Sequence, residues 1–385
     1  MTNNKDKKVL NVPNLRFPEF TGEWMKCKFG EIATGFDYGM NAAAKPYDGQ
    51  NKYIRITDID EASSTYNNSS IVSPDGILSE NYVVNEGDIL LARTGASTGK
   101  SYLYRKSDGK LYYAGFLIRA NVAEHNPYFV FSQLHTHRYW RWVSIMSARS
   151  GQPGINSLEY ASFPIFTTTL KEENKISSLL SLIDERITTQ NKIIEDLKKL
   201  KSAISLKMLH SESWEQFRIK DIAIIGRGRV ISSVEISQQK NPTYPVYSSQ
   251  TSNEGIMGYL DDYMFEGEYI SWTTDGANAG TVFYRNGKFN CTNVCGLLKL
   301  KKGFDTHFVS LVLAEATKKY VSVNLANPKL MNNTMGNIQI RLPKLEEQKR
   351  ISIVFRRLHE LLAIHNNLLT EYSKQKQYLL SQMFI

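Results

Sequence analysis

The 385-residue chain has little cysteine and no long apolar run. Its three cysteines, Cys27, Cys291 and Cys295, are too few for a disulfide framework, and they lack the neighbouring histidines that would complete a structural zinc site. No uncharged apolar stretch approaches the roughly 18 residues that a membrane span needs, and the first residues carry no apolar signal region. We therefore expect a cytoplasmic protein with reduced thiols, no metal and no membrane association.

Catalytic motifs are also scarce. Residues 94–101 (TGASTGKS) approach a Walker A loop, but Thr94 stands where the first glycine belongs and the following residues are typical of a strand. The NPTY sequence at 241–244 lacks the second proline of the NPPY tetrapeptide with which amino-methyltransferases hold adenine. No zinc-protease, nucleophile-elbow or paired-carboxylate pattern occurs. We predict a turn between strands at 94–101, and a chain that is not an enzyme and needs no cofactor.

The composition is that of a folded protein with a modest positive charge. Apolar residues make up 42% and charged residues 22%, which excludes wholesale disorder. Lysine and arginine number 47 against 38 acidic residues, giving a formal net charge of +9. This excess permits a nucleic-acid partner but does not identify one.

The chain repeats itself. Residues 170–208 align without a gap to residues 345–383 at a constant offset of 175, with identities that include Glu172 and Glu347. Weaker matches precede them: EWMKCKFGEIA at 23–33 with SWEQFRIKDIA at 213–223, and EGDILLARTG with EGEYISWTTDG. The order is therefore globular, helical, globular, helical.

Both helical segments carry a heptad-like apolar stripe without glycine or proline. At about 1.5 Å per residue each would be roughly 58 Å long, which is more than a helix packed only on its own domain requires. We predict that the two copies pair with each other as an antiparallel coiled coil. The predicted seam consists of Ile176, Leu180, Ile183, Ile187, Ile194, Leu197, Ile204, Met208, Ile351, Phe355, Leu358, Leu362, Leu369, Tyr372, Leu379 and Met383.

The globular segments combine short strand-like runs with a few helical stretches. Runs such as KYIRITDID and KLYYAGFLIR have strand composition, with turns at 107–109 and 286–287. Residues 129–146 and 306–323 are helical candidates. Each globular segment is thus predicted to be α+β.

Several segments carry a further signal: NVPNLRFPEFTGEW at 11–24, the EGDILLARTG and EGEYISWTTDG segments, YPVYSSQTSNEGIMGYLDDY at 244–263, GQPGIN, ANPKLMNN and the final KQYLLSQMFI. Together they resemble the specificity subunits of type I restriction-modification systems. This resemblance implies an α+β fold with two similar target recognition domains separated by two long helices in an antiparallel coiled coil, related by a pseudo-twofold axis. The implied domains are 1–169 (first recognition domain), 170–210 (central helical spacer), 211–344 (second recognition domain) and 345–385 (C-terminal helical spacer).

The resemblance also implies a function. Each domain would read one half of a bipartite site in double-stranded DNA, and the helices would set the spacer and carry two methyltransferase subunits, joined by restriction-translocase subunits that cut. Direct readout uses polar side chains on base edges, and lysine or arginine on phosphates. By repeat correspondence, the candidate DNA-binding residues are Arg93, Thr94, Ser97, Thr98, Lys100, Ser150, Gln152, Asn156, Arg227, Arg229, Thr273, Thr274, Asp275, Asn278, Asn327, Lys329, Asn332 and Asn333.

An alternative function remains open at this point. A structural coiled-coil adaptor that binds proteins through its two globular segments would show the same repeat, and its positive charge would be incidental.

Overall fold

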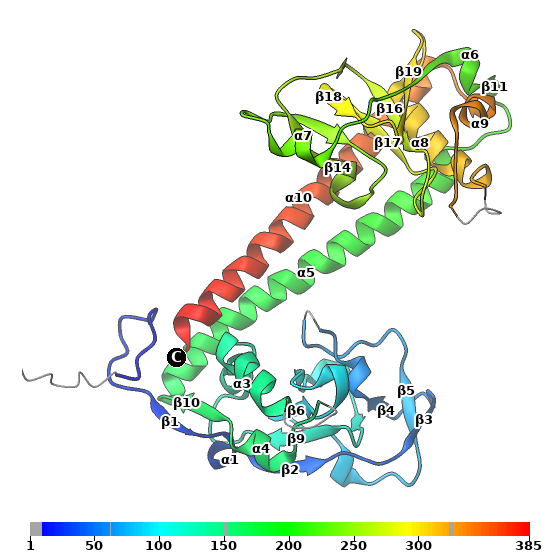
Figure 1. Ribbon diagram of the computed structural model, residues 1–385. Coiled ribbons are helices and arrows are strands. Elements are labelled where there is room, and N and C mark those ends of the chain that lie inside the picture. The colour runs from blue at the N-terminus through cyan, green and yellow to red at the C-terminus, as the bar shows by residue number, and fades with distance from the viewer. Residues whose placement is uncertain (1–9, 62, 149–152, 323–326) are drawn as a thin grey trace, which may run out of the picture. The chain divides into compact units, whose positions relative to one another are not determined.

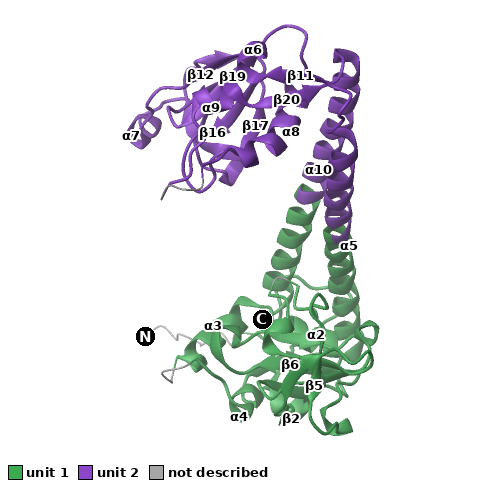
Figure 2. Ribbon diagram, turned by 90° about the vertical axis from the view of Figure 1, so that its right-hand side faces the viewer, with its two compact units in different colours: residues 1–191, 367–385 green, residues 192–366 purple. Residues whose placement is uncertain are grey.

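A computed structural model describes residues 10–61, 63–148, 153–322 and 327–385. The chain divides into two compact units, residues 1–191 with 367–385, and residues 192–366. Figure 2 colours them separately and shows that each unit takes one end of both long helices.

The two long helices are confirmed. α5 spans Leu170–Met208 and α10 spans Leu345–Met383, at 39 residues each (Figure 1). The first turn of each helix contains two acidic residues, Glu172 and Glu173 in α5 and Glu346 and Glu347 in α10, whose negative charges interact favourably with the positive end of the helix dipole.

The helices run antiparallel within each unit. In unit 1, Ile176, Leu180 and Ile183 near the start of α5 share a core with Leu379 and Met383 near the end of α10. In unit 2 the roles reverse, since Ile351 and Phe355 from the start of α10 share a core with Ile204 and Met208 from the end of α5. Burying each large apolar side chain contributes about 1.5–3 kcal/mol, so both ends of the pair are firmly anchored.

Both units contain the same four-stranded antiparallel sheet. In unit 1 the strand order is β2 (Thr34–Tyr38), β9 (Leu117–Asn121), β6 (Asp88–Ala92) and β7 (Ser101–Leu103). In unit 2 it is β12 (Ala223–Arg227), β19 (Cys295–Leu300), β16 (Tyr269–Thr273) and β17 (Val282–Arg285). The identical order shows that the sequence repeat is a repeat of topology.

Two smaller strand pairings are repeated as well. β1 (Met25–Lys28) pairs with β10 (Pro164–Thr167), as β11 (Glu215–Arg218) pairs with β20 (Gln339–Leu342). β4 (Lys52–Ile54) runs parallel to β8 (Leu111–Tyr113), as β13 (Tyr244–Tyr247) does to β18 (Lys288–Cys291). The remaining strands are β3 (Ala43–Pro46) with β5 (Val72–Asp75) in unit 1, and β14 (Ile256–Leu260) and β15 (Phe265–Glu266) in unit 2.

The short helices complete each body. They are α1 (Phe29–Ile32), α2 (Pro127–Gln133), α3 (His137–Ser147) and α4 (Ser157–Ala161) in unit 1, and α6 (Ile219–Ile222), α7 (Ser233–Ser237), α8 (Thr306–Ala316) and α9 (Asn332–Asn337) in unit 2. The helix predicted over 129–146 is two helices, because the Thr136 side chain caps a new start at the Tyr139 amide. The helix predicted over 306–323 ends at Ala316 and continues as a 3-10 turn, Thr317–Lys319.

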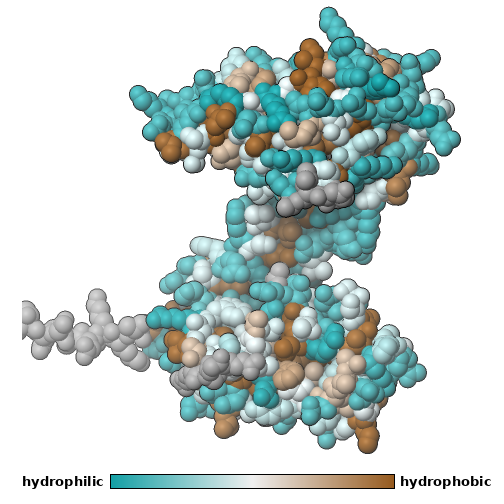
Figure 3. All heavy atoms as spheres, turned by 45° about the vertical axis from the view of Figure 1, so that its right-hand side comes forward, coloured by the Kyte–Doolittle hydropathy of each residue, from teal (hydrophilic) through white to brown (hydrophobic). Residues whose placement is uncertain are grey.

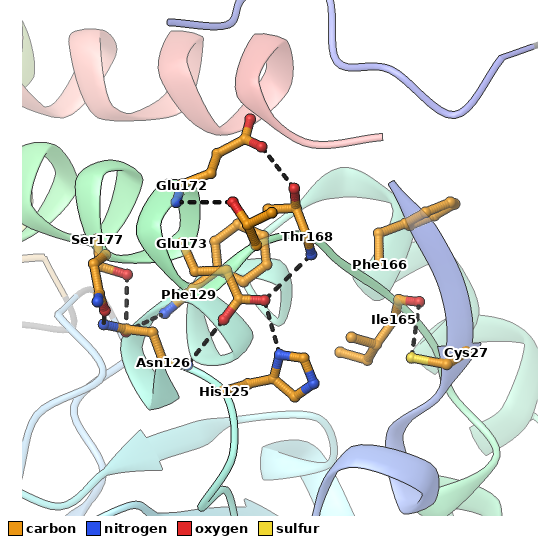
Figure 4. Close-up of polar contacts among 12 residues, drawn as sticks. Cys27, His125, Asn126, Phe129, Ile165, Phe166, Thr168, Glu172, Glu173 and Ser177 are labelled. Carbon is orange, nitrogen blue, oxygen red and sulfur yellow. Dashed lines mark hydrogen bonds and ion pairs between the residues drawn. The ribbon is translucent and has the colours of Figure 1, made fainter. Parts of the chain in front are cut away.

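A buried polar network fixes the start of α5 to the body of unit 1 (Figure 4). The carboxylate of Glu173 accepts hydrogen bonds from the amides of Asn126 (2.9 Å) and Thr168 (3.3 Å) and contacts His125 Nδ1 at 2.9 Å. In unit 2 the repeat position is Gln348, whose side-chain oxygen accepts from the Asp305 amide at 2.9 Å. In each unit the first turn of the long helix thus accepts a hydrogen bond from the N-cap residue of a neighbouring helix, Asn126 of α2 in unit 1 and Asp305 of α8 in unit 2.

Candidate nucleic-acid interface

In unit 1 the turn after β6 is joined to the segment before α4. Gly95 donates its amide to the carbonyl of Pro153 (3.0 Å), and Ile155 donates its amide to the carbonyl of Arg93 (2.9 Å). Thr94 and Gly154 form an antiparallel bridge. Two candidate segments that are about 60 residues apart in the sequence therefore make one continuous surface.

Unit 2 repeats this arrangement bond for bond. Gly276 donates its amide to the carbonyl of Pro328 (3.0 Å), and Leu330 donates its amide to the carbonyl of Thr274 (2.8 Å). Asp275 and Lys329 form the matching antiparallel bridge. The buried indole of Trp272 donates to the Leu330 carbonyl at 2.9 Å and so helps to hold this pair of loops in place.

The turn at 94–101 lies between β6 and β7, as the sequence predicts. Its candidate side chains differ in how freely they can reach a ligand. Arg93 stacks on the ring of Tyr38 at 4.6 Å, and Lys100 contacts Glu61 at 3.1 Å. Thr98 is buried, and its hydroxyl donates to the Gly95 carbonyl at 2.8 Å.

The other candidates of unit 1 have mixed positions. Thr94 and Ser97 are half-buried. Asn156 is exposed, and its side-chain oxygen caps α4 by accepting from the Glu159 amide at 2.9 Å. Ser150 and Gln152 lie outside the described residues.

In unit 2 several candidates shape the loops. Thr273 and Thr274 are buried, with hydroxyls that donate to the carbonyls of Asn278 and Val294. The guanidinium of Arg227 donates to the side-chain oxygen of Asn332 at 2.8 Å. Arg229 forms an ion pair with Glu235, which neutralises its charge locally.

The remaining candidates of unit 2 face solvent. Asn278, Asn327, Lys329 and Asn333 are exposed, and Asp275 is half-buried. Among the described residues, the Lys329 ammonium has no ion pair. This lysine is therefore free to contact a phosphate.

A cavity of about 630 Å³ in unit 1 adds residues that the sequence did not single out. It lies beside Arg93 and is lined by Tyr38, Arg55 and Phe116, among others. Tyr38 and Phe116 are 41% and 58% exposed. No spacing in the sequence links these residues, because strands far apart along the chain bring them together.

The predicted seam side chains are all buried or half-buried. The buried ones are Ile176, Leu180, Ile183, Ile194, Ile351, Phe355, Leu358, Leu379 and Met383, and the half-buried ones are Ile187, Leu197, Ile204, Met208, Leu362, Leu369 and Tyr372. Four polar residues interrupt the stripe at matching places: Gln190, Lys201, His365 and Lys376. The ammonium of Lys376 contacts the Asp184 carboxylate at 2.7 Å, so this interruption forms a bridge between the helices of unit 1.

Two further observations bear on the kind of site present. Within the described ranges, no group of three or more His, Cys, Asp or Glu side chains could hold a metal ion, and no helix is long and apolar enough to cross a membrane. Figure 3 shows that the visible face of both units is mainly hydrophilic, with separate apolar side chains.

Each half of the chain is thus an α+β body with a pair of joined loops, followed by a long helix. The model of the type I restriction modification DNA specificity domain matches residues 211–372. A Mycoplasma pneumoniae protein described as a type I specificity subunit is 38% identical over 196 residues, which cover 50% of this chain and 81% of that protein. The chain belongs to the type I specificity subunit family.

Other relatives match over shorter regions or in fold alone. The specificity subunit of the type I restriction enzyme MpnII from M. pneumoniae is 45% identical over 141 residues, covering 36% of this chain and 42% of that one. The crystal structure of a type I restriction-modification S subunit from M. genitalium superposes with a TM-score of 0.73 at 16% identity, covering 97% of this chain and 99% of that one. The latter likeness shows the shared fold.

Proposed function

We propose that the chain is a noncatalytic specificity subunit in which each unit reads one half of a bipartite site in double-stranded DNA. The observation that carries this proposal is the repeated pair of hydrogen-bonded loops, at 93–100 with 153–156 and at 273–280 with 327–333. A protein that reads two half-sites needs two equivalent reading surfaces, which a dimeric repressor obtains from two chains. Duplication supplies both within one chain here.

The side chains on these loops suit the two kinds of DNA contact. Lys329 and Arg93 are the cations best placed to contact phosphates, while Asn278, Asn327 and Asn333 present amide groups of the type that pair with base edges. Thr98, Thr273 and Thr274 act by holding the loops in shape, since their hydroxyls are already bonded within the chain. The other candidates stay predictions.

The proposed division of labour follows the repeat. Residues 1–169 and 211–344 are the recognition domains, and residues 170–210 and 345–385 are helical spacers that set the separation of the half-sites. Methyl transfer, DNA cleavage and ATP hydrolysis belong to partner chains: two methyltransferase subunits and restriction-translocase subunits. We place the complex in the cytoplasm, where its DNA target lies.

A domain exchange tests the proposal. Residues 211–344 are replaced by the matching region of another specificity subunit, and methylated adenines are mapped across the genome of cells that carry the complex. We expect one half of the methylated motif to change and the other to stay. Replacing residues 1–169 is the reciprocal control, and an exchange that alters both halves contradicts the division.

A second experiment separates DNA recognition from a protein adaptor role. The complex with methyltransferase is incubated with a random-sequence duplex library, and bound duplexes are recovered by mobility shift and sequenced. Enrichment of a bipartite motif is expected. Recovery of sequences without enrichment would favour the adaptor.

A further inference from the structure

Residues 15–19, from the N-terminal part of the chain, pack against the start of α5 in unit 1. The guanidinium of Arg16 forms two hydrogen bonds with the Glu172 carboxylate, Nε to Oε1 at 2.7 Å and Nη2 to Oε2 at 2.8 Å. The amide of Leu15 donates to the carbonyl of Gln382 at 2.8 Å. Lys175 forms an ion pair with Glu19 and lies over the ring of Phe17 at 4.6 Å. The segment 15–19 (LRFPE) thus contacts three residues: Gln382, Glu172 and Lys175.

The internal repeat carries these three positions into unit 2. At the offset of 175, Glu172 corresponds to Glu347, Lys175 to Arg350, and Gln382 to Lys207. All three counterparts line one groove of about 870 Å³, together with Trp214, Pro343 and Ile351. Two of the charges are retained, since a carboxylate again faces the groove with a cation one helical turn beyond it, whereas Lys207 takes the place of the neutral Gln382.

The groove of unit 2 is open where that of unit 1 is filled. The Glu172 side chain is 1% exposed, whereas Glu347 is exposed. Trp24 is 1% exposed and donates to Glu172, whereas its counterpart Trp214 is half-buried. Among the described residues, neither the Glu347 carboxylate nor the Arg350 guanidinium has a partner.

The segment at the equivalent place in unit 2 is much shorter. In unit 1, residues 10–23 precede Trp24, but in unit 2 only residues 209–213 separate the end of α5 from Trp214. These five residues connect the helix to the strand. His210, Ser211 and Ser213 line the groove, but the connection contains no arginine that could take the place of Arg16. Within the described residues, no segment of this chain pairs with Glu347 or Arg350, so the groove is open to another polypeptide.

We propose that the groove of unit 2 binds an extended segment of a partner polypeptide that carries arginine, an aromatic residue and, two positions further, an acidic residue. The arginine pairs with Glu347, and the ring and the acidic group pair with Arg350, as Arg16, Phe17 and Glu19 do in unit 1. Arginine suits this role because its planar fork binds a carboxylate through two hydrogen bonds. We assign this partner to another subunit of the restriction-modification complex. That assignment rests on the proposed function, whereas the binding chemistry does not.

A second copy of this chain is the less favourable occupant. Its only segment of this kind, residues 15–19, already binds Glu172 in its own unit 1. Moving the segment to a neighbouring molecule would empty one groove for each groove filled and would uncover the buried Glu172. Exchange therefore gains no contacts.

A peptide of residues 10–21 of this chain (LNVPNLRFPEFT) tests the proposal as a labelled probe added to the full-length protein. We expect saturable binding measured by fluorescence anisotropy, and no binding of a scrambled peptide of the same composition. Glu347→Arg is expected to weaken binding at least tenfold, and Arg350→Glu similarly. The matched control is Glu346→Arg, an exposed neighbour in the first turn of α10 that does not line the groove, and it should bind as the parent does.

A charge reversal separates recognition from loss of folding. The peptide with Arg16→Glu should fail on the parent protein and bind the Glu347→Arg protein at least fivefold better than the unaltered peptide does. Equal binding of the unaltered peptide to parent and Glu347→Arg proteins would overturn the proposal, as would failure of the peptide to exceed its scramble. Light scattering that shows a dimer of the chain abolished by Glu347→Arg would assign the groove to a second copy and also overturn it. The assay contains no DNA, so failure of the DNA-reading proposal would leave its result unchanged.

Discussion

Glu172 and Glu347 stand at the same position of a repeated helix, yet their surroundings differ completely. The first is buried against Arg16, Thr168 and Trp24, while the second faces solvent at the edge of a groove. The backbone around them is the same, since both follow a strand that pairs with the first strand of its unit. The two units therefore share the same backbone arrangement. The additional segment that contains Arg16 decides that Glu172 is buried while Glu347 is not.

The electrostatics of the two positions follow from that burial. Burial raises the pKa of Glu172, but the hydrogen bonds from Arg16 and Thr168 and the charge of Arg16 outweigh it, so the net pKa is below its ordinary value. The same contact raises the pKa of Arg16. The ion pair therefore contributes stability above the ordinary carboxylate pKa, and the contribution is lost as the pH falls through the lowered value.

The largest expected difference between the two units comes from removing each carboxylate. Glu172→Ala removes the carboxylate that accepts hydrogen bonds from the half-buried Arg16, the buried Trp24 indole and Thr168, and should lower the free energy of unfolding of unit 1 by about 3 kcal/mol. Glu347→Ala removes an exposed, unpaired group and should change stability by less than about 0.5 kcal/mol. Urea unfolding followed by fluorescence measures both, and equal effects would show that the two grooves are equivalent.

A smaller loss of stability is expected at a glycine in each unit where another segment of the backbone comes very close. A Cβ on Gly228 would lie 1.5 Å from the Cys291 carbonyl oxygen, and one on Gly39 would lie 2.3 Å from the Ala114 oxygen. Gly228→Ala should therefore cost about 2 kcal/mol, because the parallel pairing next to it has to shift. Gly226→Ala is the control, since nothing lies within 4 Å of its Cβ position. A thermal melt that leaves both variants at the parent midpoint would contradict this packing.

Acid should lower the stability of both units, because each contains a histidine that stays neutral while the chain is folded. Burial, with a positive charge nearby, lowers the pKa of His135 in unit 1 and of His307 in unit 2 to about 4. The unfolded chain takes up these protons near pH 6.5 and the folded chain does not, so stability is complete above pH 6.5 and falls as the pH drops toward 4. Each histidine should account for about 2 kcal/mol between pH 7 and pH 5. Unfolding measured at both pH values should show this dependence flattened in His135→Gln and in His307→Gln, and an unchanged slope in both would contradict it.

The smallest effects are expected at the loops. Lys329 is unpaired within the described part of the chain, whereas Lys100 is held by Glu61. Lys329→Ala should weaken DNA binding of the complex on all sequences alike and reduce the salt dependence of log K by about 1, with a lesser change for Lys100→Ala. Binding titrations at several salt concentrations measure this, and Lys302→Ala, an exposed lysine away from the loops, is the control. A change of sequence preference without a change in salt slope would show that Lys329 contacts a base.

Much of the fold could be predicted because its signals are local. The seam spacing and the absence of glycine and proline predict both long helices. The break between α2 and α3 could not be predicted, because the sequence alone does not distinguish a threonine that caps a helix from one inside a helix. Of the candidate site, the sequence could select the two segments by their correspondence, but not the backbone hydrogen bonds that join them, nor Tyr38 and Phe116 beside them.

The sequence by itself determined that this protein contains two copies of a globular body followed by a long helix. The ungapped repeat shows the duplication, and its periodic apolar stripe is a local signal that predicts the helices. Only the tertiary structure decided which equivalent residues differ in role. Glu172 is buried because Arg16, distant in the chain, folds over it. Glu347 is exposed because the five residues before Trp214 include no arginine to pair with it. Burial of a charge depends on contacts made at long range, and no local pattern records them.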